Sequence, residues 1–144
     1  MFQATKVLPY PAHFLKDIVA DVKEYPKFLP MLKSAIIFSE TENSFQADLT
    51  ISSGAFEKNY RSKVFVSEYS VKAQAVPDKI FKFLESQWHF YPHEENHCKV
   101  EFMLHFELRS TLLQLTVGKF LDKIAAATMT AFEERAKDLW KFLN

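Results

Sequence analysis

The sequence predicts an α+β fold in which a curved antiparallel sheet of about seven strands wraps around a long C-terminal helix. Between residues 34 and 108, stretches with strand character follow one another with only a few turn-forming residues between them, and such short connections favour antiparallel neighbours. From residue 112 onward the apolar residues recur at helical spacing. A helix of about 30 residues, roughly 45 Å long, must lie across the whole sheet to bury its apolar stripe.

Length and composition narrow the classes of protein. The chain has 144 residues, 18 basic and 18 acidic side chains, 15 phenylalanines and 2 glycines, which suits a single domain over residues 1–144. Glycine-rich nucleotide loops are excluded because each needs several glycines close together. The neutral balance argues against DNA binding through phosphate contacts. With one cysteine and no apolar run near the roughly 20 residues of a membrane span, we expect a cytoplasmic protein, at most peripheral at the inner face of the cell membrane.

The N-terminal part is predicted to form one strand and two short helical segments. Residues 5–8 have strand character and end at Pro9 and Pro11, which cannot donate to a sheet. Apolar residues at helical spacing predict a helix over residues 12–22. Residues 24–30, which contain two prolines, are expected to form a turn or short helical stub.

Six further strands and the long helix account for the rest of the chain. The strands are expected at residues 34–39, 44–51, 56–66, 69–75, 81–91 and 99–108. The last strand is the clearest, because its even positions are apolar and its odd positions mostly polar, which predicts one buried and one solvent-facing side. The expected buried stripe of the helix is Leu113, Val117, Leu121, Ile124, Thr128, Phe132, Arg135 and Leu139, widened by Phe120, Ala125, Ala136 and Leu143.

Several motifs that could carry chemistry are better explained as ordinary structure. Residues 93–97 read HEENH, the zinc-protease spacing, but they join two predicted strands and lack a helical stripe, so we predict a solvated hairpin loop. Cys98 follows His97 directly, and adjacent strand residues point to opposite faces, so we predict a buried structural cysteine. His105 should point to solvent. No catalytic set and no metal site are therefore predicted.

Four charged residues lie on predicted strands: Arg61, Lys63, Glu101 and Glu107. They could form an acid–base constellation, but we predict cross-strand charge pairs on the wet face of the sheet. The phenylalanine and leucine stripes are compatible both with a filled core and with an apolar ligand cavity.

Three blocks carry a family resemblance: EYPKFLP at residues 24–30, FKFL at 81–84 with WHF at 88–90, and CKVEF at 98–102, continuing to AFEERAK at 131–137. Together they resemble the coenzyme Q-binding family of START-like, polyketide cyclase-like domains. Its bacterial members include proteins named ribosome association toxin RatA, and its mitochondrial members are ubiquinone-binding proteins. The resemblance covers nearly the whole chain. It implies a helix-grip fold with two short helices after the first strand, in agreement with the patterns above.

The resemblance also implies a function. The family is thought to hold ubiquinone or a similar polyprenyl lipid between sheet and C-terminal helix, as a quinone carrier or chaperone for respiratory electron transport, with no chemistry of its own and no covalently bound cofactor. We expect the polar partners of the head group at the cavity mouth, near residues 25–30, where Lys27, Phe28 and Leu29 could contact a membrane transiently. The predicted lipid-binding residues are Tyr25, Phe28, Leu29, Phe81, Trp88, Phe90, Phe102, Leu104, Phe106, Leu121, Ile124, Thr128 and Phe132.

Two alternatives stay open. A RatA-like protein would bind the large ribosomal subunit and block subunit association, which needs a basic patch. The available cations lie among acids: Lys23, Lys27, Lys33, Lys58, Arg61 and Lys63. An aromatic polyketide cyclase or dehydratase would need an acid–base pair in the cavity, whereas the inward positions are largely apolar. The chain also departs from the family at residues 79–81 and 86–88, where it lacks the family's glycines, so we expect a different backbone there.

Overall fold

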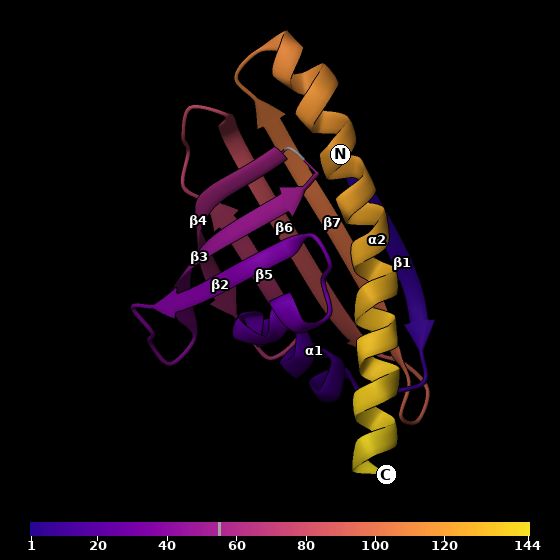
Figure 1. The fold of residues 1–144 in the computed structure, drawn as a ribbon. Coiled ribbons are helices and arrows are strands. Elements are labelled where there is room, and N and C mark those ends of the chain that lie inside the picture. Colours follow the sequence, from indigo (N-terminus) through magenta and orange to yellow (C-terminus); the bar gives the residue numbers. More distant parts are fainter. Residues whose placement is uncertain (55) are drawn as a thin grey trace.

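The computed structural model, which describes residues 1–54 and 56–144, shows one antiparallel sheet gripping a long helix (Figure 1). Within these residues the sheet has seven strands in the order β1-β7-β6-β5-β4-β3-β2. They are β1 (Phe2–Leu8), β2 (Leu32–Phe38), β3 (Ser44–Ser53), β4 (Phe56–Val66), β5 (Ser70–Ala75), β6 (Phe81–Pro92) and β7 (Cys98–Leu108). The helices are α1 (Ala12–Ala20), the 3₁₀ helix η1 (Val22–Lys27) and α2 (Thr111–Leu143). The predicted helix-grip fold is confirmed.

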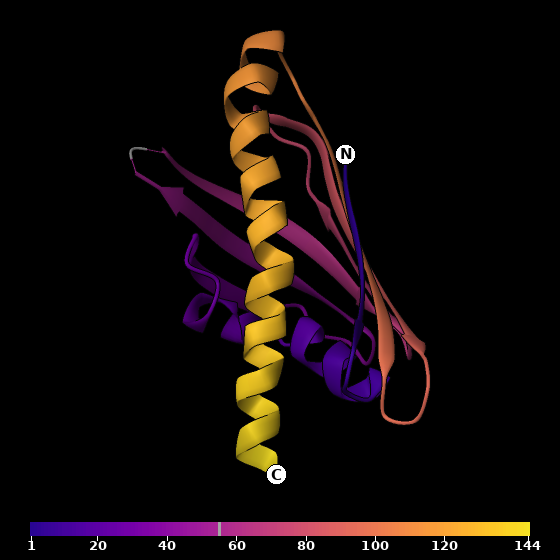
Figure 2. The same cartoon turned by 90° about the vertical axis from the view of Figure 1, so that its right-hand side faces the viewer.

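The topology places the first strand beside the last. Strands β2 to β7 follow one another as a meander, and α1 and η1 carry the chain from β1, at one edge of the sheet, to β2 at the other. Strand β1 starts at Phe2, earlier than predicted, because the whole of it pairs with β7, from Phe2 opposite Leu104 to Leu8 opposite Cys98. Figure 2 shows the sheet curving behind α2, which crosses it from end to end.

Helix α2 begins one residue before the predicted start and has 33 residues. The side chain of Ser110 caps it by accepting a hydrogen bond from the backbone N–H of Leu113 at 3.1 Å. The observed buried stripe is Val117, Gly118, Leu121, Ala125, Met129, Phe132 and Ala136. Met129 was not predicted in it, and Leu143 was predicted to widen it but is 67% exposed, because the C-terminal end of α2 projects beyond the sheet (Figure 1).

The two short helices follow the first strand as predicted, with a shifted boundary. Helix α1 ends at Ala20 rather than near residue 22. The backbone N–H of Asp21 bonds to the carbonyl of Ile18 at 3.3 Å, which tightens the chain into the 3₁₀ helix η1. Pro26 lies inside η1, which fits a short 3₁₀ segment better than a continued α-helix.

The loops agree with one expectation and with part of another. Residues 93–97 form the predicted hairpin loop, closed by the backbone N–H of His93 on the carbonyl of His97 at 3.0 Å. Of the two places where we expected a different backbone, residues 79–81 adjoin an irregularity, because the pairing of β6 with β7 shifts in register between Phe81 and Phe83, whereas residues 86–88 pair regularly. Among the described residues, the non-glycine positions with positive φ are Ser39 and Asn96, and β6 runs unbroken through residues 86–88.

Asp78 shapes the loop before β6 without glycine. Its carboxylate accepts hydrogen bonds from the backbone N–H groups of Ile80 and Phe81, both at 2.8 Å, and pairs with Lys58 at 2.9 Å. Partial burial alone would raise the pKa of Asp78, but Lys58 and the two backbone N–H groups together hold it below its usual value. The Asp78 side chain therefore shapes this turn, which contains no glycine.

The outer face of the sheet carries charge pairs, and those of Arg61 and Glu107 join neighbouring strands as predicted, whereas that of Glu101 lies within β7. Arg61 pairs with Asp48 at 2.7 Å, Glu107 with Lys82 at 3.5 Å and Glu101 with Lys99 at 3.7 Å. Lys63 and His105 are exposed on the same face. Cys98 is fully buried, as we predicted for a structural cysteine. Burial raises the pKa of its thiol to about 11.

Candidate ligand cavity

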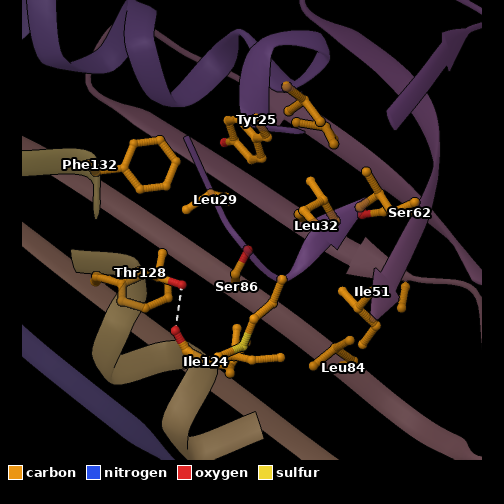
Figure 3. Close-up of a pocket in the computed structure, with 18 of the residues that line it drawn as sticks. Tyr25, Leu29, Leu32, Ile51, Ser62, Leu84, Ser86, Ile124, Thr128 and Phe132 are labelled. Carbon is orange, nitrogen blue, oxygen red and sulfur yellow. Dashed lines mark hydrogen bonds between the residues drawn. The ribbon is translucent and has the colours of Figure 1, made fainter. Parts of the chain in front are cut away.

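A cavity lies between the inner face of the sheet and α2 (Figure 3). Its volume is about 180 Å³, counted as space open to the centre of a water molecule. Residues from η1, from the segment between η1 and β2, from β2 to β7, and from α2 line it. Among the residues that the structure describes, every lining side chain is apolar or carries an uncharged hydroxyl. The cavity therefore suits a neutral, largely apolar molecule.

Small side chains on three neighbouring strands create the floor of this cavity. Ser62 of β4 lies opposite Ala75 of β5, and Ala73 of β5 lies opposite Ser86 of β6. All four point to the inner face and line the cavity. Because their side chains are short, the sheet does not reach the helix at this point.

An aromatic wall closes one end of the floor. Trp88 stacks on Phe102 with ring centroids 4.4 Å apart, and Phe132 of α2 meets Trp88 edge-on at 5.0 Å. Trp88 lies two residues beyond Ser86 on β6, and it is opposite Phe102 of β7. The three rings join sheet and helix directly, so the cavity ends there.

The cavity opens between two aromatic contacts along α2. At one end Phe56 meets Phe120 at 5.1 Å, and at the other Phe28 meets Phe132 at 5.0 Å. The two helix positions are about 18 Å apart at the helical rise. Between them the lining includes Pro30 and Ala127, which are exposed and mark the mouth.

Five hydroxyl groups line the cavity, and two already have partners. The Tyr25 hydroxyl donates to the carbonyl of Val19, and the Thr128 hydroxyl donates to the carbonyl of Ile124 at 2.7 Å (Figure 3). Burial raises the pKa of Tyr25 far above its usual value. Its phenol therefore stays protonated as the donor of this bond.

The other three hydroxyls, on Tyr60, Ser62 and Ser86, make no hydrogen bond within the described part of the chain. Ser62 is 3% exposed overall. None of the three is sealed from water-sized space, since no fully enclosed side-chain oxygen lacks a partner among the described residues. Burial raises the pKa of Tyr60 to about 12. The free hydroxyls thus lie on the floor, on Ser62 and Ser86, and beside it, on Tyr60. Where a head group would find its partners stays a prediction.

Eight of the predicted lipid-binding residues line the cavity. They come from the η1 segment, from β6 and β7, and from α2, which the structure brings together around one space: Tyr25, Leu29, Trp88, Phe102, Leu104, Ile124, Thr128 and Phe132. Their role in binding stays a prediction.

The other five predicted residues do not line the cavity: Phe28, Phe81, Phe90, Phe106 and Leu121. The sequence pattern correctly assigned the strand residues and Leu121 to the inner side, but position along the element decides whether an inner residue meets the cavity or solid core. Phe81 is fully buried beside Tyr60, 6.1 Å between centroids. Phe90 lines a small gap next to α1 instead.

Phe28 and Phe106 have equally specific neighbours. The Phe28 ring packs against Tyr25 and Phe132, under the guanidinium of Arg135 at 5.2 Å. The ring is partly buried by these neighbours, and its contact with a membrane stays a prediction. Phe106 packs close to Gly118, where the missing side chain lets strand and helix approach.

The sequence reasoning missed the residues that make the space. Five such lining residues are absent from the predicted set, which consists mainly of large apolar side chains: Tyr60, Ser62, Ala73, Ala75 and Ser86. A signal was present. Small residues recur at inward positions on three consecutive strands, whereas a filled core uses large ones there.

The lining offers little for catalysis. Within the described residues it contains no histidine, cysteine, carboxylate, lysine or arginine. Of the side chains that commonly transfer protons, the described lining holds only the two tyrosines, Tyr25 and Tyr60. The described residues also hold no group of three or more metal-ligating side chains. No helix in the described part of the chain has the length and hydropathy to span a membrane.

Comparison with known proteins agrees with this geometry. The family model described as polyketide cyclase/dehydrase and lipid transport matches residues 8–133. The chain belongs to this family. Within it, the chain is 32% identical to ribosome association toxin RatA of Rickettsia prowazekii, over 97% of this chain and 98% of that protein.

Two further proteins are similar to the chain, one in sequence and one in fold. The chain is 28% identical to the mitochondrial coenzyme Q-binding protein COQ10 homolog B of Xenopus laevis, over 94% of this chain and 57% of that protein. A Streptomyces aromatase/cyclase, Zhui, has the same fold with a TM-score of 0.85 at 12% identity, over 94% of this chain and 92% of that one. The relatives named for binding or ribosome association are thus nearer in sequence than this cyclase.

Proposed function

We propose that the chain binds an isoprenoid quinone, or a neutral lipid of similar shape, in the cavity between sheet and α2, and carries it without chemical change. The single observation behind this proposal is the apolar, uncharged lining. A carboxylate or phosphate lipid would need a buried cation to offset its desolvation, and the described lining has none. The likeness to a coenzyme Q-binding protein supports the same class of ligand.

The size of the cavity limits which part of the ligand it encloses. A water molecule needs about 10–15 Å³ of space measured in this way, so about 180 Å³ accommodates on the order of ten waters. That is roughly one substituted ring with a short tail. A longer isoprenoid tail has to leave through the mouth beside Pro30 and Ala127.

Native mass spectrometry of protein purified from its own host tests the proposal. We expect a fraction of the protein to carry a neutral lipid that organic extraction releases as a quinone. Delipidated protein should also bind a short-chain quinone, followed by quenching of Trp88 fluorescence in a Trp140→Phe background, because Trp88 lines the cavity and Trp140 packs elsewhere, against Tyr10 and Phe14. Protein that neither carries a quinone nor binds one added in solution would refute the proposal.

A second candidate is association with the large ribosomal subunit, favoured by the likeness to proteins named ribosome association toxin. The charge pattern gives it less support. Lys27 pairs with Glu24 at 2.7 Å, and Lys33 with Glu57 at 3.0 Å. Lys58 and Arg61 are paired as described above, and Lys23 lies 4.0 Å from Asp21. Five of the six candidate cations thus have an acidic partner, and Lys63 is exposed. Co-sedimentation with ribosomal subunits at moderate salt would detect this activity.

A further inference from the structure

We infer that the ligand enters head first: Ser62 and Ser86, assisted by Tyr60, donate hydrogen bonds to two opposed carbonyl oxygens of a neutral ring, while the apolar tail leaves through the mouth. This inference rests on the proposed function, which it makes specific to a ligand class and an orientation. It reverses the sequence-based expectation that the head group lies at the mouth.

Three hydroxyl groups that line the cavity are available as hydrogen-bond donors. Ser62 and Ser86 on the cavity floor, and Tyr60 next to Ser62 on the inner side of β4, line the cavity and make no side-chain hydrogen bond among the described residues, whereas the hydroxyls of Tyr25 and Thr128 are already used. A polar group facing apolar space is costly unless a partner reaches it. A ligand oxygen is such a partner. Because the hydroxyls are neutral, they suit carbonyl oxygens better than an anionic head group.

The spacing of the two serines fits a ring with two carbonyls. Ser62 and Ser86 lie on strands separated by β5, and their opposite residues on β5, Ala75 and Ala73, are two positions apart. At the usual strand spacing and rise, their Cα atoms lie about 12 Å apart. The hydroxyls are closer than this, since the floor is concave. A six-membered ring with opposed carbonyls, plus one hydrogen bond of about 2.8 Å at each end, spans a comparable length.

The shape around the floor fits a flat ring. Ala73 and Ala75 place only methyl groups between the two serines, so a flat ring can lie against the sheet there. Ile124 and Thr128 of α2 lie across from it (Figure 3). Toward the mouth the lining becomes Met31, Pro30 and Ala127, without a free donor. An apolar tail fits that exit, whereas a carbonyl head would lose its partners.

Single hydroxyl removal tests the inference. Delipidated wild type, Ser62→Ala and Ser86→Ala are titrated with a decyl-substituted benzoquinone and with decylbenzene, which has the same tail and no carbonyl. We expect each serine variant to bind the quinone about three- to tenfold more weakly than wild type, because one hydrogen bond is lost. Each variant should bind decylbenzene as tightly as wild type does. Ser34→Ala is the matched control, because Ser34 bonds to Thr50 on the opposite face of the sheet, and should change neither affinity.

The outcomes separate the inference from the proposed function. If wild type binds the quinone and both serine variants keep the wild-type ratio of quinone to decylbenzene affinity, the head-first orientation is wrong and the proposed function survives. If wild type binds neither molecule, both fail. A quinone with a bulky reporter at the end of its tail should bind like the unlabelled one, and loss of binding would place the tail inside and overturn the inference.

Discussion

Replacing Ala73 with leucine tests whether the cavity is unfilled by side chains. Leucine adds three carbons, each worth about 0.8 kcal/mol when buried, and fixing its rotamer costs about 0.5–1 kcal/mol. Since Ala73 lines the cavity, the added atoms have room, and the net gain is about 1.5 kcal/mol in the free energy of unfolding. For a chain of this length that is roughly 3–6 °C in Tm. The same leucine occupies the ring site, so binding of a short-chain quinone should fall at least tenfold.

Urea denaturation of delipidated protein measures the first effect and fluorescence titration the second. The matched control is Ala47→Leu, on the inner face of β3, where Ala47 is fully buried and does not line the cavity. There the extra carbons overpack the core and should destabilise the protein by about 1–3 kcal/mol. The test is that the two substitutions change the free energy of unfolding in opposite directions. If Ala73→Leu destabilises as much as Ala47→Leu, side chains fill the space and the reasoning fails.

Three further predictions concern the scaffold. Asp78→Asn removes a charge paired with Lys58; because the folded-state pKa of Asp78 is lowered, the loss in unfolding free energy should be about 1 kcal/mol at neutral pH. It should fade as the pH falls below about 4, through the folded-state pKa. Ser110→Ala removes the cap on the Leu113 N–H and should cost about 1 kcal/mol in urea denaturation. Cys98, buried with a pKa raised to about 11, should react with a thiol reagent far more slowly in the folded protein than in urea.

Each of these has a control or a contradicting result. An Asp78→Asn loss that grows in acid would show that the charge is not the stabilising element. Ser110→Asp keeps a capping oxygen and should stay close to wild type. Rapid labelling of Cys98 in native buffer would mean that β7 opens readily or that the thiol is not buried.

Sequence patterns predicted the fold well because they report periodicity, which backbone geometry dictates. The alternation from Val100 to Leu108 set the inner face of β7, and the helical period from residue 112 set α2. Boundaries were less certain. The start of β1 depends on its pairing with β7, a contact about a hundred residues away along the chain, which no local pattern contains.

The cavity was only partly predictable for a different reason. Periodicity tells which side a residue faces, but it does not tell where two layers fail to meet. Phe81 and Trp88 both face inward, yet Phe81 fills solid core and Trp88 borders the cavity. The space depends on Ser62 and Ala75 being adjacent across β4 and β5, and that requires the strand register.

Helix α2 is held by aromatic contacts through Phe120 and Phe132, and about three turns between them pass over the cavity. In that stretch Leu121, Ala125 and Met129 are buried in the core, whereas Ile124, Ala127 and Thr128 on the neighbouring side of the helix line the cavity. A bound molecule would supply the missing packing, so folding and occupancy become one equilibrium. At a ligand concentration a hundred times its Kd the folded state gains about 2.7 kcal/mol. The amount of intact protein in a cell would then follow the supply of its ligand, and amide exchange in residues 121–131 would report it.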